Sequence, residues 1–435
     1  MLFLFKVVVL FLIVFNFRLP VIYSSATATI LMCTVYYFFK RGSISFTFFF
    51  QRYNAVILIG TVLLAYIITL YGFFHHTDIM PGKEMRIWIE FMMLGITVYA
   101  LPLLVEGKES TALEEIALII CYAFAIQGCI DFAAYLYAPL GDFLFNMKPE
   151  YMRETVMDPA ANMARFRLYN LSGSVFVELT ASFGVAFVVF FWLMLKSNHP
   201  YISGWKKYAI FFFIFMGTTF AGRTGFIGLL IGLGGWLFFS FNRIFTVIKQ
   251  NTGYIITFFV GLFFVYNFVF SENQRDSFSN EVFPFAFEWY YNYRDNGRLD
   301  VASANATTHH YYYVYDATLL KGLGKDPFGG GTMYPHSDAG YMNNLVFGGI
   351  PFLICLFIYQ SLYFITPINI TRKIHSRNNQ IDAGFFLLLF LYIAFVEIKT
   401  PALGYLHLIE VMYLALGSSC ILQYFFQKEQ NELIG

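Results

Sequence analysis

Residues 173–195 read GSVFVELTASFGVAFVVFFWLML, an apolar run that contains one carboxylate, Glu178, and no cation. A helix that crosses the roughly 30 Å hydrocarbon core of a bilayer needs about 17–25 such residues. Because hydrocarbon offers no water to backbone amides, the segment has to satisfy its own hydrogen bonds, which a helix does even where Phe, Tyr and Ile are frequent. The run therefore predicts a membrane-spanning helix.

Similar runs recur along the whole chain. The sequence is 58% hydrophobic, 21% aromatic and only 13% charged, which excludes a protein with an ordinary water-facing surface. We predict an all-α polytopic integral membrane protein that forms a single membrane domain, 1–435, with about twelve transmembrane helices. The predicted spans are 2–17, 20–39, 53–74, 86–105, 113–137, 173–195, 208–222, 225–241, 253–270, 341–364, 383–400 and 405–426.

Lysine and arginine in short loops indicate the orientation of the spans, because these residues are retained preferentially in the cytoplasm. They are more frequent on the side that holds 40–52, 196–207, 243–249 and 372–377, which predicts that both termini are cytoplasmic. Two large loops, 138–172 and 271–340, then face outward. Most of the residues that lie outside the predicted spans are therefore expected on the external side of the membrane.

Several classes of site are missing from the sequence. It has no phosphate-binding GxxxxGK[ST] loop, no dinucleotide fingerprint and no sizeable cytoplasmic domain, so we expect no ATP or nucleotide-sugar site. All five cysteines lie in predicted spans, and no Cys/His cluster has zinc spacing. We expect no metal, no cofactor and no nucleic-acid partner, and a substrate that arrives from the membrane or from outside.

The segment 221–226, AGRTGF, interrupts two short apolar runs at their outward ends. A guanidinium at this depth is costly unless it reaches the headgroups or binds an anion, and its planar fork suits phosphate oxygens. The glycines beside Arg223 and Thr224 let a ligand or another backbone approach closely. Arg223 is therefore a candidate phosphate ligand; the alternative is a helical hairpin whose arginine is anchored at the headgroup level.

Arg165 and Arg167 lie in the first large loop, just before the span that begins near Gly173. Two cations at positions i and i+2 point the same way only in an extended chain, and beside a bilayer such a pair suits a lipid diphosphate. Glu178, slightly inside the following span, is an intramembrane carboxylate and hence a functional candidate. Interfacial anchoring of the arginines, or an ion pair between one of them and Glu178, is the alternative.

The second large loop is aromatic in its first half and rich in glycine near its end. Residues 283–291, FPFAFEWYY, suit either the headgroup zone or stacking on sugar faces. The glycine run around Gly330 forces turns just upstream of His336. A histidine titrates near external pH, which suits a general base, and Tyr334 and Asp338 lie close enough in sequence to orient it. An ordinary loop histidine is the alternative.

The order of these features resembles the O-antigen polymerase and O-antigen ligase superfamily of bacterial membrane glycosyltransferases. The family pattern has a small-Arg-[Ser/Thr]-Gly segment that leads into a span, which corresponds to 222–225. It also has a Pro-x-x-Gly-x-Gly turn, a histidine and a span with Gly-Ile. These features correspond to Pro327, Gly329 to Gly331, His336 and Gly349-Ile350.

The resemblance rests on short motifs at about 221–232 and 322–351, with a looser match at 165–180. The histidine is followed by Ser337-Asp338 rather than by the Asn that is typical of the ligases. This departure favours the polymerase branch and leaves the role of His336 open.

The resemblance implies a GT-C-like, multi-pass protein of the bacterial inner membrane whose active site faces the periplasm, so that 138–172 and 271–340 are periplasmic loops. Family substrates are oligosaccharide repeat units linked to undecaprenyl diphosphate. The expected reaction moves the growing glycan onto a new lipid-linked unit, and the bond to diphosphate supplies the energy without a nucleotide. Membrane lipid and a chain-length regulator protein are the expected partners.

The same resemblance assigns roles to the candidate residues. Arginines would hold the donor and leaving diphosphates, and the histidine, supported by Asp338, would activate the acceptor hydroxyl. The expected catalytic residues are His336, Asp338 and Arg223, and the expected substrate-binding residues are Arg165, Arg167, Glu178, Thr224, Tyr334 and Gly330.

Two alternatives remain open. A ligase of the same superfamily would pass finished polysaccharide to a lipid A core. A lipid-linked oligosaccharide transporter or flippase would do no chemistry, but that class is expected to show internal repeats and charged residues at the membrane midplane. Here most arginines are predicted at outer helix ends, and the sequence shows no convincing repeat.

Overall fold

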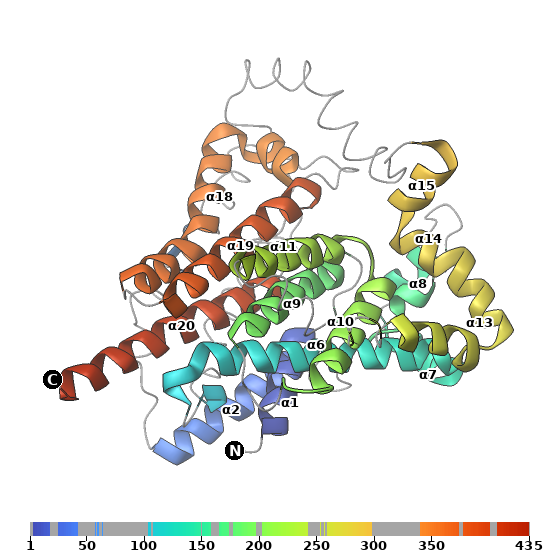
Figure 1. Ribbon diagram of the computed structural model, residues 1–435. Coiled ribbons are helices and arrows are strands. Elements are labelled where there is room, and N and C mark those ends of the chain that lie inside the picture. Colours follow the sequence, from blue (N-terminus) through green and yellow to red (C-terminus); the bar gives the residue numbers. More distant parts are fainter. Residues whose placement is uncertain are drawn as a thin grey trace. The chain divides into compact units, whose positions relative to one another are not determined.

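The computed structural model is helical throughout the part of the chain that it describes, and no strand occurs there (Figure 1). The chain divides into two compact units, one formed by Met1–Ala28 and Ala117–Leu299 and the other by Thr29–Ile116 and Asp300–Gly435. The described residues are 3–17, 25–41, 57, 59–60, 63, 103–105, 108–148, 150–157, 165–173, 177–196, 202–241, 253, 256, 259–297, 340–373, 377–400 and 407–434.

Among the described residues, 5 helices are long and apolar enough to cross a membrane, namely Ala112–Leu136, Val177–Lys196, Gly348–Arg372, Gln380–Lys399 and Leu408–Gln427. Shorter apolar helices are Phe3–Phe15, Thr224–Phe239 and Phe259–Val269. The predicted class, an all-helical multi-pass membrane protein, is confirmed at this level. The number of twelve spans stays a prediction. The spans predicted at 53–74 and 86–105 lie mostly outside the described residues, and those predicted at 2–17, 225–241 and 253–270 correspond to the shorter helices.

The first unit is organised around α9 (Val177–Lys196), whose residues are buried continuously from Leu179 to Phe190. α10 (Lys206–Ala221) and α11 (Thr224–Phe239) pack against it, and Figure 1 shows the three helices in green. Gly228 and Gly232 of α11 face α9 so closely that a Cβ atom at Gly228 would overlap the backbone of Gly184. Small residues thus allow α11 to contact the backbone of α9 directly, as in other membrane helix pairs.

A second close contact joins α6 (Ala112–Leu136) to α10. Gly128 approaches the backbone of Phe213, and a Cβ atom at Gly217 would lie 2.9 Å from the Cα atom of Gly128. The ring of Phe124 on α6 meets Phe183 of α9 with centroids 5.1 Å apart, and Phe15 of α1 (Phe3–Phe15) at 4.9 Å. These contacts hold α1, α6, α9 and α10 in one core.

Both segments predicted as large outer loops form short helices where they are described. The first contains α7 (Ala138–Asn146), α8 (Glu150–Met157) and a 3₁₀ helix, η3 (Arg165–Leu168). The second contains α13 (Glu272–Ser277), a π-helix (Phe278–Val282), α14 (Phe283–Ala286) and α15 (Glu288–Asn296). Aromatic residues from both segments share one cluster, which includes Phe166, Phe220, Phe270 and Phe285.

The second segment is attached to the end of α6 by Gln274. Ser271 and Gln274 form a capping box at the start of α13. The Gln274 side-chain amide also donates to the backbone oxygens of Tyr135 and Leu136 at 3.1 and 2.9 Å, and the Tyr135 hydroxyl donates to the Gln274 backbone oxygen at 2.8 Å. One side chain thus satisfies carbonyls that the C-terminus of α6 leaves unpaired.

The second unit contains α18 (Gly340–Lys373), α19 (Arg377–Lys399) and α20 (His407–Ile434). α18 is kinked at Gly349, which has φ 66° and ψ −165° and precedes Pro351 by two positions. Buried polar pairs link the helices: Asn344 Nδ2 donates to Glu397 Oε1 at 3.0 Å, and the Tyr424 hydroxyl donates to Asp382 Oδ2 at 2.5 Å.

Candidate functional site

The turn between α10 and α11 is held in place by the hydroxyl of Thr180. This hydroxyl donates to the carbonyl oxygen of Gly222 at 2.6 Å and accepts from the backbone N–H of Gly225 at 3.1 Å. Gly222 has φ 147°, a conformation that is open to glycine and strained for other residues. A Cβ atom at Gly225 would lie 2.7 Å from the Thr180 backbone oxygen. Gly222 is therefore required by its backbone conformation, and Gly225 by the close approach of the Thr180 backbone.

Arg223 lies in this turn, immediately before α11. Its guanidinium forms an ion pair with Glu288 at the start of α15, and the two side chains are only 15% and 22% exposed. The guanidinium also lies over the ring of Phe285, 5.4 Å from the centroid. Burial lowers the pKa of Arg223 from its ordinary value. Both the phosphate-ligand hypothesis and the alternative of a helical hairpin anchored by its arginine stay open, because the observed countercharge is the internal carboxylate of Glu288.

Arg167 reaches the same place from the segment 138–172. Its guanidinium lies over the ring of Phe285 at 4.8 Å, and its Nε donates to the carbonyl oxygen of Ala221 at 3.4 Å. Burial lowers the pKa of Arg167 to about 10, and the nearby charge of Arg223 contributes to that shift. Two guanidiniums thus share one aromatic ring in a partly buried setting, and the carboxylate of Glu288, paired with Arg223, offsets part of their mutual repulsion.

Arg165 lies apart from this pair. Its guanidinium bonds to Asp142 at 2.6 Å and lies over the ring of Phe145 at 4.4 Å, and the side chains of the ion pair are about half exposed. The local chain is a 3₁₀ helix instead of the extended strand that the i, i+2 reasoning requires. The two neighbouring arginines therefore reach different partners, and the structure brings Arg167, but not Arg165, to Arg223.

The other expected residues fall into two groups. Thr224 is buried in the first turn of α11, and Glu178 lies in the first turn of α9, two positions before the Thr180 clamp. The remaining candidates, His336, Asp338, Tyr334 and Gly330, lie outside the described residues. Within the described residues, no group of His, Cys, Asp or Glu side chains could hold a metal ion.

A buried lysine fixes the segment that carries Arg167. Lys148 Nζ donates to Asn170 Oδ1 at 2.7 Å and to the carbonyl oxygen of Ser172. Asn170 Oδ1 also accepts the backbone N–H of Ser172 at 3.0 Å. Burial lowers the pKa of Lys148 to about 7, and the negative charge of Asp131 opposes this shift. The ammonium thereby ties the end of α7 to the chain that follows η3.

We expect Lys148→Met to destabilise the protein by about 3 kcal/mol, because the change leaves the buried oxygens of Asn170 and Ser172 without their donor. Thermal unfolding of the purified protein in detergent measures this loss of stability.

The native pKa of Lys148 lies below the unfolded value of 10.5, so the unfolded chain binds the proton more tightly. Wild-type stability should therefore fall as pH decreases from about 10 towards 7, and the variant should lack this component.

Arg294→Met is the control for this experiment, because Arg294 is exposed and pairs with its neighbour Asp295 at 2.7 Å. Water screens such exposed pairs, so Arg294→Met should unfold at nearly the wild-type temperature. Equal effects of the two substitutions would show that Lys148 has no special role in holding the outer segment.

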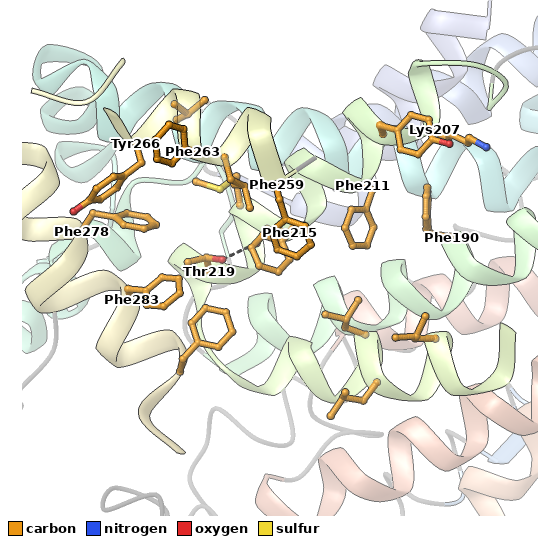
Figure 2. Close-up of a pocket in the computed structure, with 18 of the residues that line it drawn as sticks. Phe190, Lys207, Phe211, Phe215, Thr219, Phe259, Phe263, Tyr266, Phe278 and Phe283 are labelled. Carbon is orange, nitrogen blue, oxygen red and sulfur yellow. Dashed lines mark hydrogen bonds between the residues drawn. The ribbon is translucent and has the colours of Figure 1, made fainter. Parts of the chain in front are cut away.

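An apolar groove of about 890 Å³ lies in the same unit between α9, α10, α11, the helix Phe259–Val269 and the segment 278–291. Figure 2 shows its aromatic walls, with Lys207 at one end and Phe283 at the other. Phe287 belongs to the lining and packs on Phe226 with ring centroids 5.0 Å apart. Neither Arg167 nor Arg223 lines the groove, but Phe283 and Phe287 belong to the same segment as Phe285 and Glu288, which contact Arg223.

Three residues of this site have no clear signal in the sequence. Thr180 is one hydroxyl in a long apolar run, and its partners are more than 40 positions away, with separations of 42 and 45. Glu288 and Phe285 lie in the aromatic stretch 283–291, whose composition indicates an interface or sugar stacking but no ion pair. Only the three-dimensional contact with the α10–α11 turn identifies them.

Comparison with known proteins does not assign the chain to a family: no family model matches it, and neither a curated protein nor a solved structure gives a match.

Proposed function

We propose that this protein is a multi-pass glycosyltransferase of the bacterial inner membrane that polymerises oligosaccharide repeat units linked to undecaprenyl diphosphate at the periplasmic face. The observation that carries the proposal is the pair Arg167 and Arg223, which lie over one ring, Phe285; Phe283 and Phe287 of the same segment line an apolar groove. Two adjacent guanidiniums suit a diphosphate, and the groove suits a long hydrocarbon chain.

In the proposed reaction, the hydroxyl oxygen of the incoming repeat unit forms a bond to the anomeric carbon of the growing chain. The bond from that carbon to the diphosphate oxygen breaks, and the diphosphate leaves with the electron pair. His336, oriented by Asp338, accepts the hydroxyl proton. Preorganised cations in a partly dry site stabilise the charge that develops on the leaving group.

The remaining predicted residues complete this proposal. Thr224 lies on α11 and Glu178 on α9, which both contact the arginine turn. Tyr334 and Gly330 would bind substrate together with them. The full arrangement has about twelve spans and the periplasmic segments 138–172 and 271–340. A chain-length regulator protein is the proposed partner.

The test is the length of surface polysaccharide on gels of a deletion strain complemented with wild type, Arg223→Ala or His336→Ala, with membrane expression checked in each strain. Wild type should restore a ladder, while the well-expressed variants should leave single repeat units on the core. If the deletion leaves chain length unchanged, the proposal fails, and ligation or transport becomes the function to test.

Thr180→Val should slow elongation about tenfold, because valine keeps the shape of threonine but leaves the Gly222 carbonyl and the Gly225 N–H without their buried partner. Initial rates of glycan elongation in membrane vesicles measure the effect, normalised to protein amount. Thr180→Ser is the matched control, because serine keeps the hydroxyl and should restore most of the rate. If valine and serine slow elongation equally, the hydroxyl does not position Arg223.

A further inference from the structure

Glu288 occupies the place where the proposed site would receive an anion. Its carboxylate pairs with the Arg223 guanidinium, and both side chains are largely shielded from solvent, with 15% and 22% exposure. Glu288 is the first residue of α15, where the partial positive charge of the helix N-terminus stabilises a carboxylate. The ion pair therefore joins the second outer segment directly to the α10–α11 turn.

A carboxylate and a phosphate present the same kind of oxygen acceptor to a guanidinium fork. Arg167, over the same ring, adds a second cation beside the Arg223–Glu288 pair. A guanidinium that is partly buried is costly when its countercharge is absent. An internal carboxylate that covers Arg223 in the empty site removes this cost and competes with an incoming phosphate.

We propose that Glu288 is an exchangeable counter-ion that holds Arg223 until a substrate diphosphate displaces it. The inference rests on the proposed function, in which Arg223 binds diphosphate, and adds the residue that sets the affinity of that site. Exchange requires only that the Glu288 side chain move away from Arg223, because α15 can keep its backbone in place. Return of the carboxylate after transfer favours release of the diphosphate product.

The test is the affinity of the full-length protein, purified in detergent, for inorganic pyrophosphate. Glu288→Gln keeps the size of the side chain and removes its charge, so we expect about tenfold tighter binding than in wild type. Glu281→Gln is the matched control: it removes one negative charge from the same segment, but Glu281 accepts a hydrogen bond from the Ser277 hydroxyl at 3.0 Å and lies elsewhere. Its affinity should stay within twofold of wild type.

Arg223→Ala distinguishes failure of the proposed diphosphate site from failure of the counter-ion role of Glu288. If Arg223→Ala abolishes binding while Glu288→Gln binds no more tightly than wild type, the counter-ion role is overturned and the diphosphate site stands. If Arg223→Ala binds as wild type does, the diphosphate site itself is absent. If Glu281→Gln and Glu288→Gln tighten binding equally, a general loss of negative charge explains the effect, and the specific role of Glu288 is likewise overturned.

Kinetics give a second readout that a purely structural role would not produce. When Glu288 only competes with the donor, its removal should lower KM for the lipid-linked donor, while slower release of diphosphate lowers kcat. A structural role would lower the amount of folded protein and leave KM unchanged. Glu288→Asp, which retains the charge, should resemble wild type in both constants.

Discussion

Arg223→Ala is expected to slow glycan elongation by about 100-fold to 1,000-fold, the range seen when one preorganised donor to a developing anion is removed. Arg223 supplies the cation that the Thr180 clamp fixes and that the ring of Phe285 shields. Initial rates in membrane vesicles, normalised to folded protein, measure the change. Arg223→Lys should recover part of the rate, because it restores the charge but lacks the planar fork.

Arg165→Ala is the matched control, since it removes the same charge from the same outer region. Arg165 pairs with Asp142 in a position about half exposed, away from the Phe285 ring. We expect its rate to fall less than threefold, in line with the small contribution of exposed ion pairs. A large loss at Arg165 and a small loss at Arg223 would contradict the site described above.

Gly228→Ala is expected to destabilise the first unit by more than about 4 kcal/mol, an effect large enough to deplete the folded protein from the membrane. The added methyl group would overlap the backbone of Gly184, so α9 and α11 would have to separate. Because α11 begins at the arginine turn, their separation would also break the contacts of Thr180. The amount of monodisperse protein after detergent extraction, and its unfolding temperature, measure the loss.

Gly234→Ala tests whether the effect comes from the helix interface. Gly234 lies on the same helix, and a Cβ atom there would meet nothing within 4 Å. Alanine favours helix over glycine by about 1 kcal/mol, so this variant should be as stable as wild type or slightly more stable. Equal losses at both glycines would mean that close packing of α9 and α11 does not govern stability.

Hydropathy identifies the spans that the structure describes because the bilayer, not local propensity, decides whether an apolar segment is helical. The run predicted at 173–195 corresponds to α9 at Val177–Lys196, and the run at 113–137 corresponds to α6 at Ala112–Leu136. The glycines around Arg223 are also recognisable in sequence as positions that permit close approach, although the backbone that approaches Gly225 is that of the distant Thr180.

The partners of Arg223 could not be predicted, since they come from residues far away in the chain. Glu288 is one carboxylate in an aromatic stretch, and nothing in its neighbours indicates an ion pair with the α10–α11 turn. For Arg165 and Arg167, the sequence pattern predicts a convergence that the structure does not show. Side chains at positions i and i+2 converge only in an extended chain, whereas the observed 3₁₀ helix directs the two side chains to different partners. The proposed role of His336 stays a prediction.

The most direct test of the central claim uses the purified full-length protein in liposomes, with a single-repeat-unit oligosaccharide on undecaprenyl diphosphate as the only added substrate. We predict products with two or more repeat units on the lipid, and one free undecaprenyl diphosphate for each new linkage, both measured by mass spectrometry. If folded protein forms no new glycosidic bond with this substrate, or forms one only after a lipid A core is added, the polymerase function is contradicted.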